Sequence, residues 1–471
     1  MRALVAFMGA SLLALWLANF AGGHGADPVW LNVVKSAVIL ALFGFFVRAV
    51  VRRRETGEGV ASSILVVHAS QTGIAEDLAR RTAEKLIAGG RDASVVDIAS
   101  VDDARLAAQQ TALFVASTTG EGDPPDSASR FALREMAEPA GLSGLQYAVL
   151  ALGDRGYADY CGFGRRLDAW LAASGASALF DRLDVDRGDE RALTEWFARL
   201  GDLGASELHS GAPSFSRWRI AERRELNPGS DNPPVFHVAL EPVGDLPDWK
   251  AGDIAVVALR TDPELAPNLP SSPVREYSLA SLPTDKRAEL VVRQMRGPDG
   301  RLGLGSGWLT ERCAVGGEVE MRLRANRSFR GPDDARPVIL LGAGSGIAGL
   351  RAHIKERAAA GRSRNWLLFG ERDRDKDYLY RDEIETWRAQ GVLARLDLGF
   401  LREDGEQLFV ERLLLEAGDD ARAWIADGAS IYVSGSRTGV GAGVDRALRE
   451  LLGAGRVDAL IAEGRYRRDV Y

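Results

Sequence analysis

Three side chains with complementary binding chemistry lie together in an apolar, β-prone run in the second half of the chain. They are Arg275, Tyr277 and Ser278. An arginine guanidinium can pair with a pyrophosphate through two parallel hydrogen bonds. A tyrosine ring can lie against another aromatic ring, and a serine hydroxyl can hydrogen-bond the edge of that ring. These groups suit a flavin dinucleotide, although an ordinary barrel strand could carry the same residues.

A glycine-rich turn that runs into a helix start strengthens this interpretation. It reads Gly303-Leu304-Gly305-Ser306-Gly307-Trp308-Leu309 and follows a strand predicted over residues 290–292 that includes Val292. Backbone N–H groups and the helix dipole at such a start favour a phosphate. Together the two stretches resemble the FAD-binding barrel of the ferredoxin-reductase superfamily. The resemblance implies an antiparallel β-barrel whose FAD ligands are Arg275, Tyr277, Ser278, Val292, Gly303, Leu304, Gly305 and Ser306.

Three predicted strands nearer the N-terminus end in polar, glycine-rich loops. Residues 63–69, 112–116 and 147–152 are apolar without alternation, which is typical of a parallel sheet covered on both faces. Loops at the carboxyl ends of such strands meet at the crevice where open α/β sheets bind ligands. The first loop precedes a helix predicted over residues 76–88, so it offers amides and a helix N-terminus to a phosphate.

The three loops resemble the FMN site of the flavodoxin-like domain in diflavin reductases. The resemblance implies that the first loop holds the FMN phosphate and that the other two bracket the ring, with Tyr157 stacked on it. Thr119 stands where many relatives have an aromatic residue. Sulfite-reductase flavoproteins also lack an aromatic residue at this position. We expect Cys161 to pack near the flavin, not to act as a nucleophile, because no histidine accompanies it. The implied FMN ligands are Ser70, Gln71, Thr72, Gly73, Ile74, Ala75, Ser117, Thr118, Thr119, Gly120, Gly122, Leu152, Gly153, Tyr157, Tyr160 and Cys161.

Another glycine-rich turn follows the strand predicted over residues 337–341. Alone such a turn is a weak signal, but after a flavin barrel it resembles the nicotinamide-nucleotide loop of the same superfamily. A later predicted strand, 429–433, leads into Ser434-Gly435-Ser436, where the family usually has Cys-Gly-Asp. The residues implied to bind NADP are Gly342, Gly344, Ser345, Gly346, Arg402, Ser434, Gly435 and Ser436.

The pocket for the 2′-phosphate of NADPH departs most from the family pattern. After the strand that ends at Phe400, only Arg402 remains as a cation. The positions of the family's lysine, tyrosine and glutamine are taken by Gln407, Phe409 and Glu411. Each lost charge-assisted hydrogen bond removes about 1.5–3 kcal/mol of preference. We expect NADPH, with NADH possible, and Arg372 or Arg374 are candidates to compensate.

The last eight residues resemble the ending of sulfite-reductase flavoproteins. They read Gly464-Arg465-Tyr466-Arg467-Arg468-Asp469-Val470-Tyr471. The resemblance implies that Tyr471 stacks on the FAD ring and leaves before nicotinamide approaches, while Asp469 and Ser278 orient the nicotinamide. The candidate catalytic residues are therefore Ser278, Ser434, Asp469 and Tyr471, although Ser434 lacks the thiol that the family usually has there.

The first fifty residues differ in composition from the rest. Two apolar runs, 3–21 and 29–51, are each about 20 residues long, the length that a helix needs to cross a bilayer. Arg2 and the arginines at 52–54 favour a hairpin over residues 1–55 with both ends in the cytoplasm. A signal peptide is the alternative for the first run. We expect a transmembrane anchor in the inner membrane, with cytoplasmic flavin domains.

Composition limits the remaining possibilities. A chain of 471 residues is too long for one core. A net charge of −7 and the lack of a basic aromatic stripe argue against nucleic-acid binding, and two cysteines are too few for a structural metal site. We expect a multidomain α/β protein: an anchor (1–55), a flavodoxin-like FMN domain (61–200), a linker (201–214), an FAD-binding barrel (214–332) and an NADP-binding domain (335–471).

The resemblance to diflavin reductases covers residues 61–471, without room for their usual helical connecting domain. It implies electron transfer from NADPH through FAD and FMN to an acceptor that takes one electron at a time. The anchor favours a membrane-associated haem or ferric-siderophore acceptor. One alternative is the flavoprotein component of an assimilatory sulfite reductase, which passes electrons to a hemoprotein. The other is a non-catalytic membrane subunit that keeps a flavodoxin fold for binding.

Overall fold

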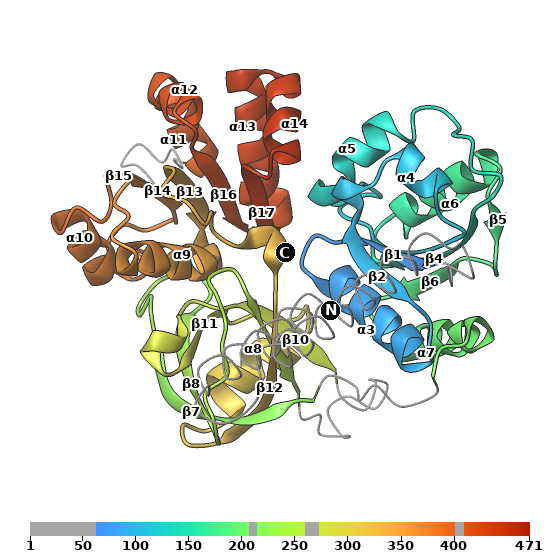
Figure 1. Cartoon of the computed structure of the whole chain (residues 1–471). Helices are drawn as coiled ribbons and strands as arrows, with labels where there is room; N and C mark the ends of the chain where they lie inside the picture. The colour runs from blue at the N-terminus through green and yellow to red at the C-terminus, as the bar shows by residue number, and fades with distance from the viewer. Residues whose placement is uncertain (1–62, 207–213, 260–272, 401–408) are drawn as a thin grey trace, which may run out of the picture. The chain divides into compact units, whose positions relative to one another are not determined.

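A computed structural model describes residues 63–206, 214–259, 273–400 and 409–471 of the chain. The predicted transmembrane hairpin and Arg402 lie outside these residues. Within them, no helix combines the length and the apolar character that crossing a bilayer requires. The described part contains three sheets, one after another along the chain (Figure 1).

The first sheet is parallel, with helices on both faces. Its strand order is β2-β1-β3-β4-β5, and β6 pairs with β4. This order reverses between β1 and β3, so the crevice predicted for a ligand lies at their carboxyl ends. The elements are β1 (Ile64–Ala69), α3 (Ile74–Ala88), β2 (Ala93–Asp97), α4 (Asp103–Ala107), β3 (Thr111–Ser117), α5 (Asp126–Arg134), β4 (Gln146–Gly153), α6 (Gly162–Ala173), β5 (Ser177–Ala178), β6 (Leu183–Asp186) and α7 (Glu190–Arg199).

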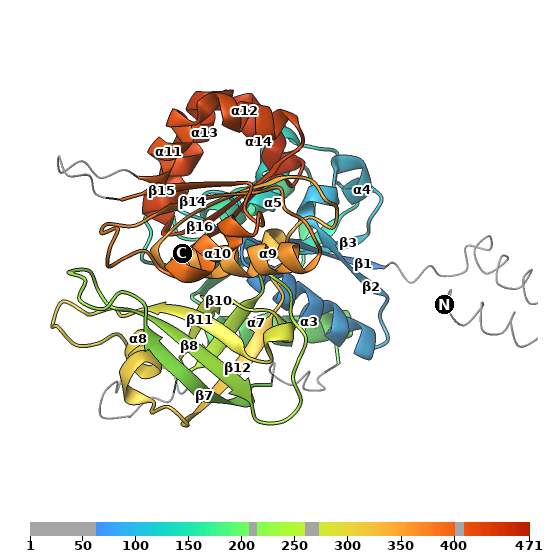
Figure 2. The same cartoon turned by 90° about the vertical axis from the view of Figure 1, so that its left-hand side faces the viewer.

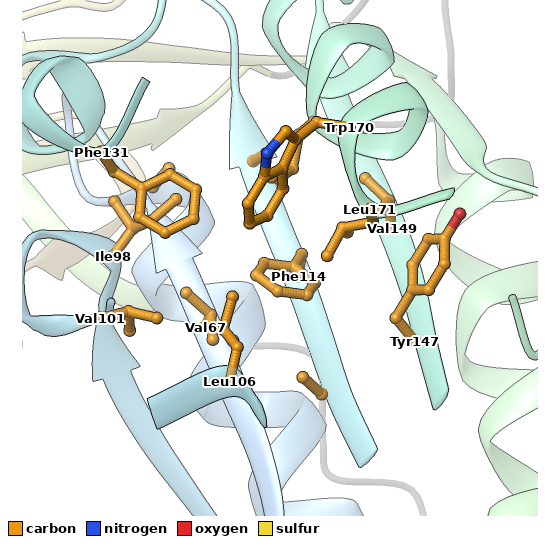
Figure 3. Packing of buried hydrophobic residues seen from close by; sticks show 14 of the residues in the cluster. Val67, Ile98, Val101, Leu106, Phe114, Phe131, Tyr147, Val149, Trp170 and Leu171 are labelled. Carbon is orange, nitrogen blue, oxygen red and sulfur yellow. The ribbon is translucent and has the colours of Figure 1, made fainter. Parts of the chain in front are cut away.

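Two apolar layers hold this sheet between its helices. Figure 3 shows the layer beneath α5 and α6, where Phe114 of β3 lies among Val67, Phe131 and Trp170. The rings of Phe131 and Trp170 meet edge to face, 5.4 Å apart. The opposite layer packs α3 and α7 on the sheet around Trp196. Burial on both faces explains why β1 and β3 are apolar without alternation.

The second sheet is antiparallel, with the order β10-β9-β12-β7-β8-β11. A bridge between Leu279 and Leu290 links its two edge strands, which closes the sheet into the expected barrel. Trp218 and Trp249 fill the interior. The elements are β7 (Ser216–Glu225), β8 (Val235–Pro242), β9 (Ile254–Ala258), β10 (Val274–Ser278), β11 (Ala288–Arg293), the short helix α8 (Leu304–Gly307) and β12 (Glu318–Arg324).

The third sheet is parallel, with the order β15-β14-β13-β16-β17. Helices α9 and α10 cover one face and α11 to α14 cover the other (Figure 2). The elements are β13 (Val338–Ala343), α9 (Ile347–Ala359), β14 (Asn365–Gly370), α10 (Arg381–Ala389), β15 (Arg395–Gly399), α11 (Val410–Glu416), α12 (Gly418–Ala426), β16 (Ser430–Gly435), α13 (Ala442–Leu452), α14 (Ala454–Ala462) and β17 (Tyr466–Val470). The last strand, β17, lies within the last eight residues, which resemble the ending of sulfite-reductase flavoproteins.

The segment predicted to be a linker begins with local structure. A 3₁₀ turn spans Leu200–Leu203, and the N–H of Ser206 donates to the carbonyl of Lys85 in α3 at 3.0 Å. The first residues after 200 are therefore tied to the flavodoxin-like sheet.

A buried arginine joins the barrel to the third sheet. The guanidinium of Arg351, in α9, donates to the carboxylate of Glu289 in β11 and to the carbonyl of Ala280, and it also donates to Glu383 of α10. Only 8% of the Arg351 side chain is exposed. Its charge is therefore matched by two carboxylates inside the contact, as a buried ion requires.

Replacing Arg351 with leucine should lower the free energy of unfolding by about 3–5 kcal/mol, because Glu289 would remain as a buried charge without its partner. Urea unfolding followed by circular dichroism measures the change. The matched control is Arg364→Leu, since the ion pair of Arg364 with Asp427 lies at the surface and such pairs contribute about 0–1 kcal/mol. Equal losses in the two variants would contradict a structural role for the buried network.

Candidate functional site

A cavity of about 1170 Å³ lies between the barrel and the third sheet. Residues 63–471 form one compact unit, so the cavity belongs to a single body. It brings together most of the residues predicted to bind FAD and several predicted to bind NADP. Those that line it are Arg275, Tyr277, Ser278, Gly303, Leu304, Gly305, Ser306, Gly344, Ser345, Ser436, Asp469 and Tyr471.

One predicted FAD residue has its side chain elsewhere. Val292 packs into the barrel interior, whereas its neighbours Val291 and Arg293 line the cavity. Successive side chains of a strand point to opposite faces. The prediction was therefore off by one residue: the side chains on either side of Val292 line the cavity. Only the backbone of Val292 remains available to a ligand in the cavity.

The glycine-rich turn forms a cradle that only glycine permits. A Cβ on Gly305 would lie 2.5 Å from Cγ of Arg275 and 2.9 Å from Oη of Tyr277, so both side chains lie directly over its backbone. Gly303 precedes α8, whose first N–H groups have no partner within so short a helix. The guanidinium and the free amides can bind a pyrophosphate, and the tyrosine ring can pack on an aromatic ring. These residues therefore fit FAD.

Ser278 and Asp469 form the polar end of the cavity. Ser278 Oγ donates to Asp469 Oδ2 at 2.6 Å, and both residues are buried. The parallel pairing of β17 with β16 positions Asp469, which lies opposite Ser434 in the register. Burial raises the pKa of Asp469 to about 6, although the hydrogen bond from Ser278 acts in the opposite direction. The carboxyl group therefore titrates close to physiological pH.

Ser434 is fully buried and does not line the cavity. Its hydroxyl has no hydrogen-bond partner within the described ranges. Buried polar atoms of this kind normally meet a ligand or an ordered water. The structure thus places Ser434 behind Asp469 in the adjacent strand, and any direct part in catalysis stays a prediction.

Tyr471 lies at the edge of the cavity and is held by three hydrogen bonds. Its N–H donates to the carbonyl of Gly435, and its terminal oxygen accepts from the N–H of Arg437, both at 3.1 Å. Its hydroxyl lies 3.1 Å from Oγ of Ser345 in the predicted nucleotide loop. The residue is 57% exposed, so displacing it costs little buried area. This position fits the predicted movable aromatic cover.

The three loops of the flavodoxin-like sheet also meet. Ser70 Oγ accepts from the N–H of Gly73 at 2.9 Å, which shapes the first loop before α3. The N–H of Ala158, in the third loop, donates to Glu121 of the second loop at 3.1 Å. Gly122 has a φ of 104° and packs against Asp159 so closely that a Cβ would clash. The sixteen residues predicted for FMN therefore lie in or next to these loops, at one edge of the sheet.

Aromatic and sulfur side chains in the third loop have different environments. Tyr157 is half-buried, and the guanidinium of Arg437 lies 5.5 Å from its ring centroid. Cys161 is fully buried, its Sγ lies 3.4 Å from the carbonyl of Ala151, and burial raises its pKa to about 11. Its thiol is thus protonated and packed, as expected for a residue that does not act as a nucleophile. Two buried hydroxyls, of Thr118 and Tyr160, have no partner among the described residues, which leaves polar groups for a ligand.

Contacts between the first loop and the reductase half were not predicted. Arg468, next to Asp469 in β17, forms an ion pair with Asp126 of α5. The amide of Gln71 donates to Asp126 at 2.9 Å and to the carbonyl of Arg468 at 3.2 Å. Arg324 donates to the carbonyl of Thr72 at 3.0 Å, and Thr72 itself lines the cavity of the barrel. The predicted FMN and FAD sites therefore lie against each other.

Comparison with known proteins supports both halves. A model of the flavodoxin family matches residues 66–198, and a model of the oxidoreductase NAD-binding domain matches residues 340–439. The chain is similar to several proteins described as "Sulfite reductase (NADPH) flavoprotein alpha-component". The one from Thiocapsa roseopersicina is 31% identical over 85% of this chain and 85% of its own length. Those from Salmonella typhimurium and Vibrio cholerae are each 26% identical, over 87% and 88% of this chain and 90% and 89% of their own lengths.

These matches establish the cofactors and the class of reaction. FMN, FAD and NADPH are the cofactors, and the protein is an NADPH-dependent diflavin reductase. The identity and coverage of the Thiocapsa protein are sufficient to assign the family. The chain belongs to the family of sulfite reductase (NADPH) flavoprotein alpha-components.

Proposed function

We propose that this protein transfers electrons from NADPH through FAD and FMN to a haem-containing partner protein. The main support is the juxtaposition of the two predicted flavin sites: Thr72 of the first FMN loop lines the cavity that Arg275 and Ser278 also line. When bound, FAD can accept a hydride and FMN can pass on single electrons, which suits a haem acceptor. The protein must hold the two flavins, orient the nicotinamide and exclude competing reactions.

Side chains of the cavity are proposed to divide these tasks. Arg275 and the N-terminus of α8 bind the pyrophosphate of FAD, and Tyr277 packs on the cofactor. Ser278 and Asp469 orient the nicotinamide of NADPH, whose ring becomes positively charged as it loses a hydride. An ionised Asp469 would stabilise that charge within a site that excludes water. Tyr471 covers the flavin until the nicotinamide replaces it.

The acceptor is proposed from the relatives. The relatives are named as flavoprotein components of sulfite reductase, so a sulfite-reducing hemoprotein is our first candidate partner. A second candidate is a membrane-associated haem or ferric acceptor. The two apolar runs at 3–21 and 29–51 favour the second, and with it a location at the inner membrane with the flavin domains in the cytoplasm.

Reconstitution of the full chain with each acceptor distinguishes the candidates. With a sulfite reductase hemoprotein, NADPH should support sulfide formation; with a ferric siderophore or haem protein, it should support reduction of the iron. Cytochrome c reduction serves as the control for a competent flavoprotein. A protein that contains both flavins but reduces none of these acceptors with NADPH would contradict the proposal.

Flavin content tests the two predicted sites separately. The purified protein should release FMN and FAD in equal amounts. Tyr157→Ala should bind FMN more weakly and yield less FMN with unchanged FAD, because the stacking ring is lost. Arg275→Ala should yield less FAD with unchanged FMN, because a charge-assisted pair with pyrophosphate contributes about 1.5–3 kcal/mol. Chromatography of the extracted flavins gives the ratio, and the unaffected flavin is the internal control in each variant. A single flavin at full occupancy would exclude the two-site assignment.

The pH dependence of NADPH oxidation tests the role of Asp469. The folded pKa of about 6 lies above the ordinary value of 3.8, so the ionised form needed for charge stabilisation is gained as pH rises through about 6. We expect hydride transfer, followed by stopped-flow absorbance, to increase across that range.

Two variants make the test specific. Asp469→Asn should be slower by roughly 10²-fold and should lose the rise near pH 6. Ser278→Ala should move the rise to higher pH, because the hydrogen bond from Ser278 lowers the pKa of Asp469. An Asp469→Asn profile with the same midpoint as the wild type would assign the titration to another group.

A further inference from the structure

The cavity continues beyond the flavin end to a second end formed by the third sheet. Residues from three elements line this part: Gly370, Glu371 and Arg372 at the end of β14, Phe409, Val410 and Glu411 at the start of α11, and Gly443 and Arg446 of α13. It lies at the carboxyl edge of the parallel sheet, where the adenosine half of a dinucleotide binds. Under the proposed function, this end would receive the adenosine half of NADPH.

Recognition of NADPH requires a cation here. The 2′-phosphate carries about −1.5 to −2 charges at pH 7, like other phosphate monoesters, whereas NADH has a neutral hydroxyl. Glu411 adds a negative charge to the pocket wall. Its carboxylate packs against α13, since a Cβ on Gly443 would lie 2.6 Å from Glu411 Cδ. A positive group must offset this carboxylate and bind the phosphate.

Four arginines line the cavity, and three of them are engaged elsewhere. Arg275 lies over Gly305 at the flavin end. Arg293 pairs with Glu371. Arg372 donates to Asn232 Oδ1 of the barrel at 2.9 Å. The fourth, Arg446, makes no ion pair and no hydrogen bond with any residue in the described ranges.

The other compensating candidate from the sequence is also occupied. The guanidinium of Arg374 lies 5.0 Å from the ring centroid of Phe400 and does not line the cavity. Of the candidates at this end that the structure describes, Arg446 therefore has the most available donors.

Helix α13 brings Arg446 to the same end of the cavity as Glu411. Arg446 follows Gly443 by three residues in α13, and residues three apart lie on one face of a helix. Gly443 packs against Glu411, and both Arg446 and Glu411 line this end of the cavity. An arginine offers a planar fork of donors that matches a phosphate.

We propose that Arg446 binds the 2′-phosphate of NADPH and determines the preference for NADPH over NADH in this chain. It takes over the task for which the family uses a lysine at the position of Gln407. Glu411 of α11, which lines the same end of the cavity, reduces that preference.

The test compares Arg446→Gln with the wild type. The ratio of kcat/KM for NADPH to that for NADH should fall roughly 10- to 100-fold, the effect of one charge-assisted contact. The fall should come from the KM for NADPH, with the NADH constants preserved. Binding of adenosine 2′,5′-bisphosphate, measured by titration calorimetry, should weaken by a similar factor, while binding of 5′-AMP should not change. Glu411→Gln should raise the same ratio.

Arg449→Gln is the matched control. Arg449 lies in the same helix, is paired with Asp445 and Asp458, and does not line the cavity, so its ratio should stay at the wild-type value. Equal losses for the two nucleotides in Arg446→Gln, or no loss, would overturn the proposal. If the wild type contains both flavins but oxidises neither nucleotide, the proposed function fails, and the bisphosphate titration still decides the role of Arg446.

Discussion

The pairing of β17 with β16 is the constraint on which both flavin sites depend. Ladder hydrogen bonds fix Asp469 opposite Ser434 and bring it within 2.6 Å of Ser278 in the barrel. Neighbouring residues of a strand point in opposite directions, so the same strand directs Arg468 toward Asp126 of the flavodoxin-like part. The chain then ends at Tyr471, whose hydroxyl reaches Ser345. A few terminal residues thus connect all three sheets.

The two interfaces around this strand differ in physical character. The barrel and the third sheet share a common apolar core that includes Val235, Val291 and Phe329, together with the buried network of Arg351. The described contacts between the flavodoxin-like part and the reductase half include polar groups at Arg324 and Arg468. Partly exposed ion pairs contribute little net stability and weaken with salt. This difference suits the proposed function, in which the FMN part must serve two partners in turn.

Much of the fold was predictable because it depends on local patterns. Unbroken apolar runs identified β1, β3, β4, β13 and β16 of the two parallel sheets, and glycine-rich loops after them identified the ligand edges. Residue-level placement depended on geometry that the sequence does not contain: a shift of one residue directs Val292 into the barrel core. The contact of Arg468 with Asp126 joins residues 342 positions apart. The position of Arg446 in the cavity depends on how α13 packs against α11, which no sequence pattern specifies. The hairpin over residues 1–55 remains a prediction.

Rapid mixing of NADPH with the oxidised two-flavin protein tests the proposed electron path most directly. Absorbance separates reduction of FAD from that of FMN when the wild type is compared with protein depleted of FMN. We expect FAD to be reduced first and FMN second, with the second step slower at high salt because the ion pair of Arg468 with Asp126 is screened. Reduction of FMN before FAD, or of FAD without any transfer to FMN, would contradict the path from NADPH through FAD to FMN.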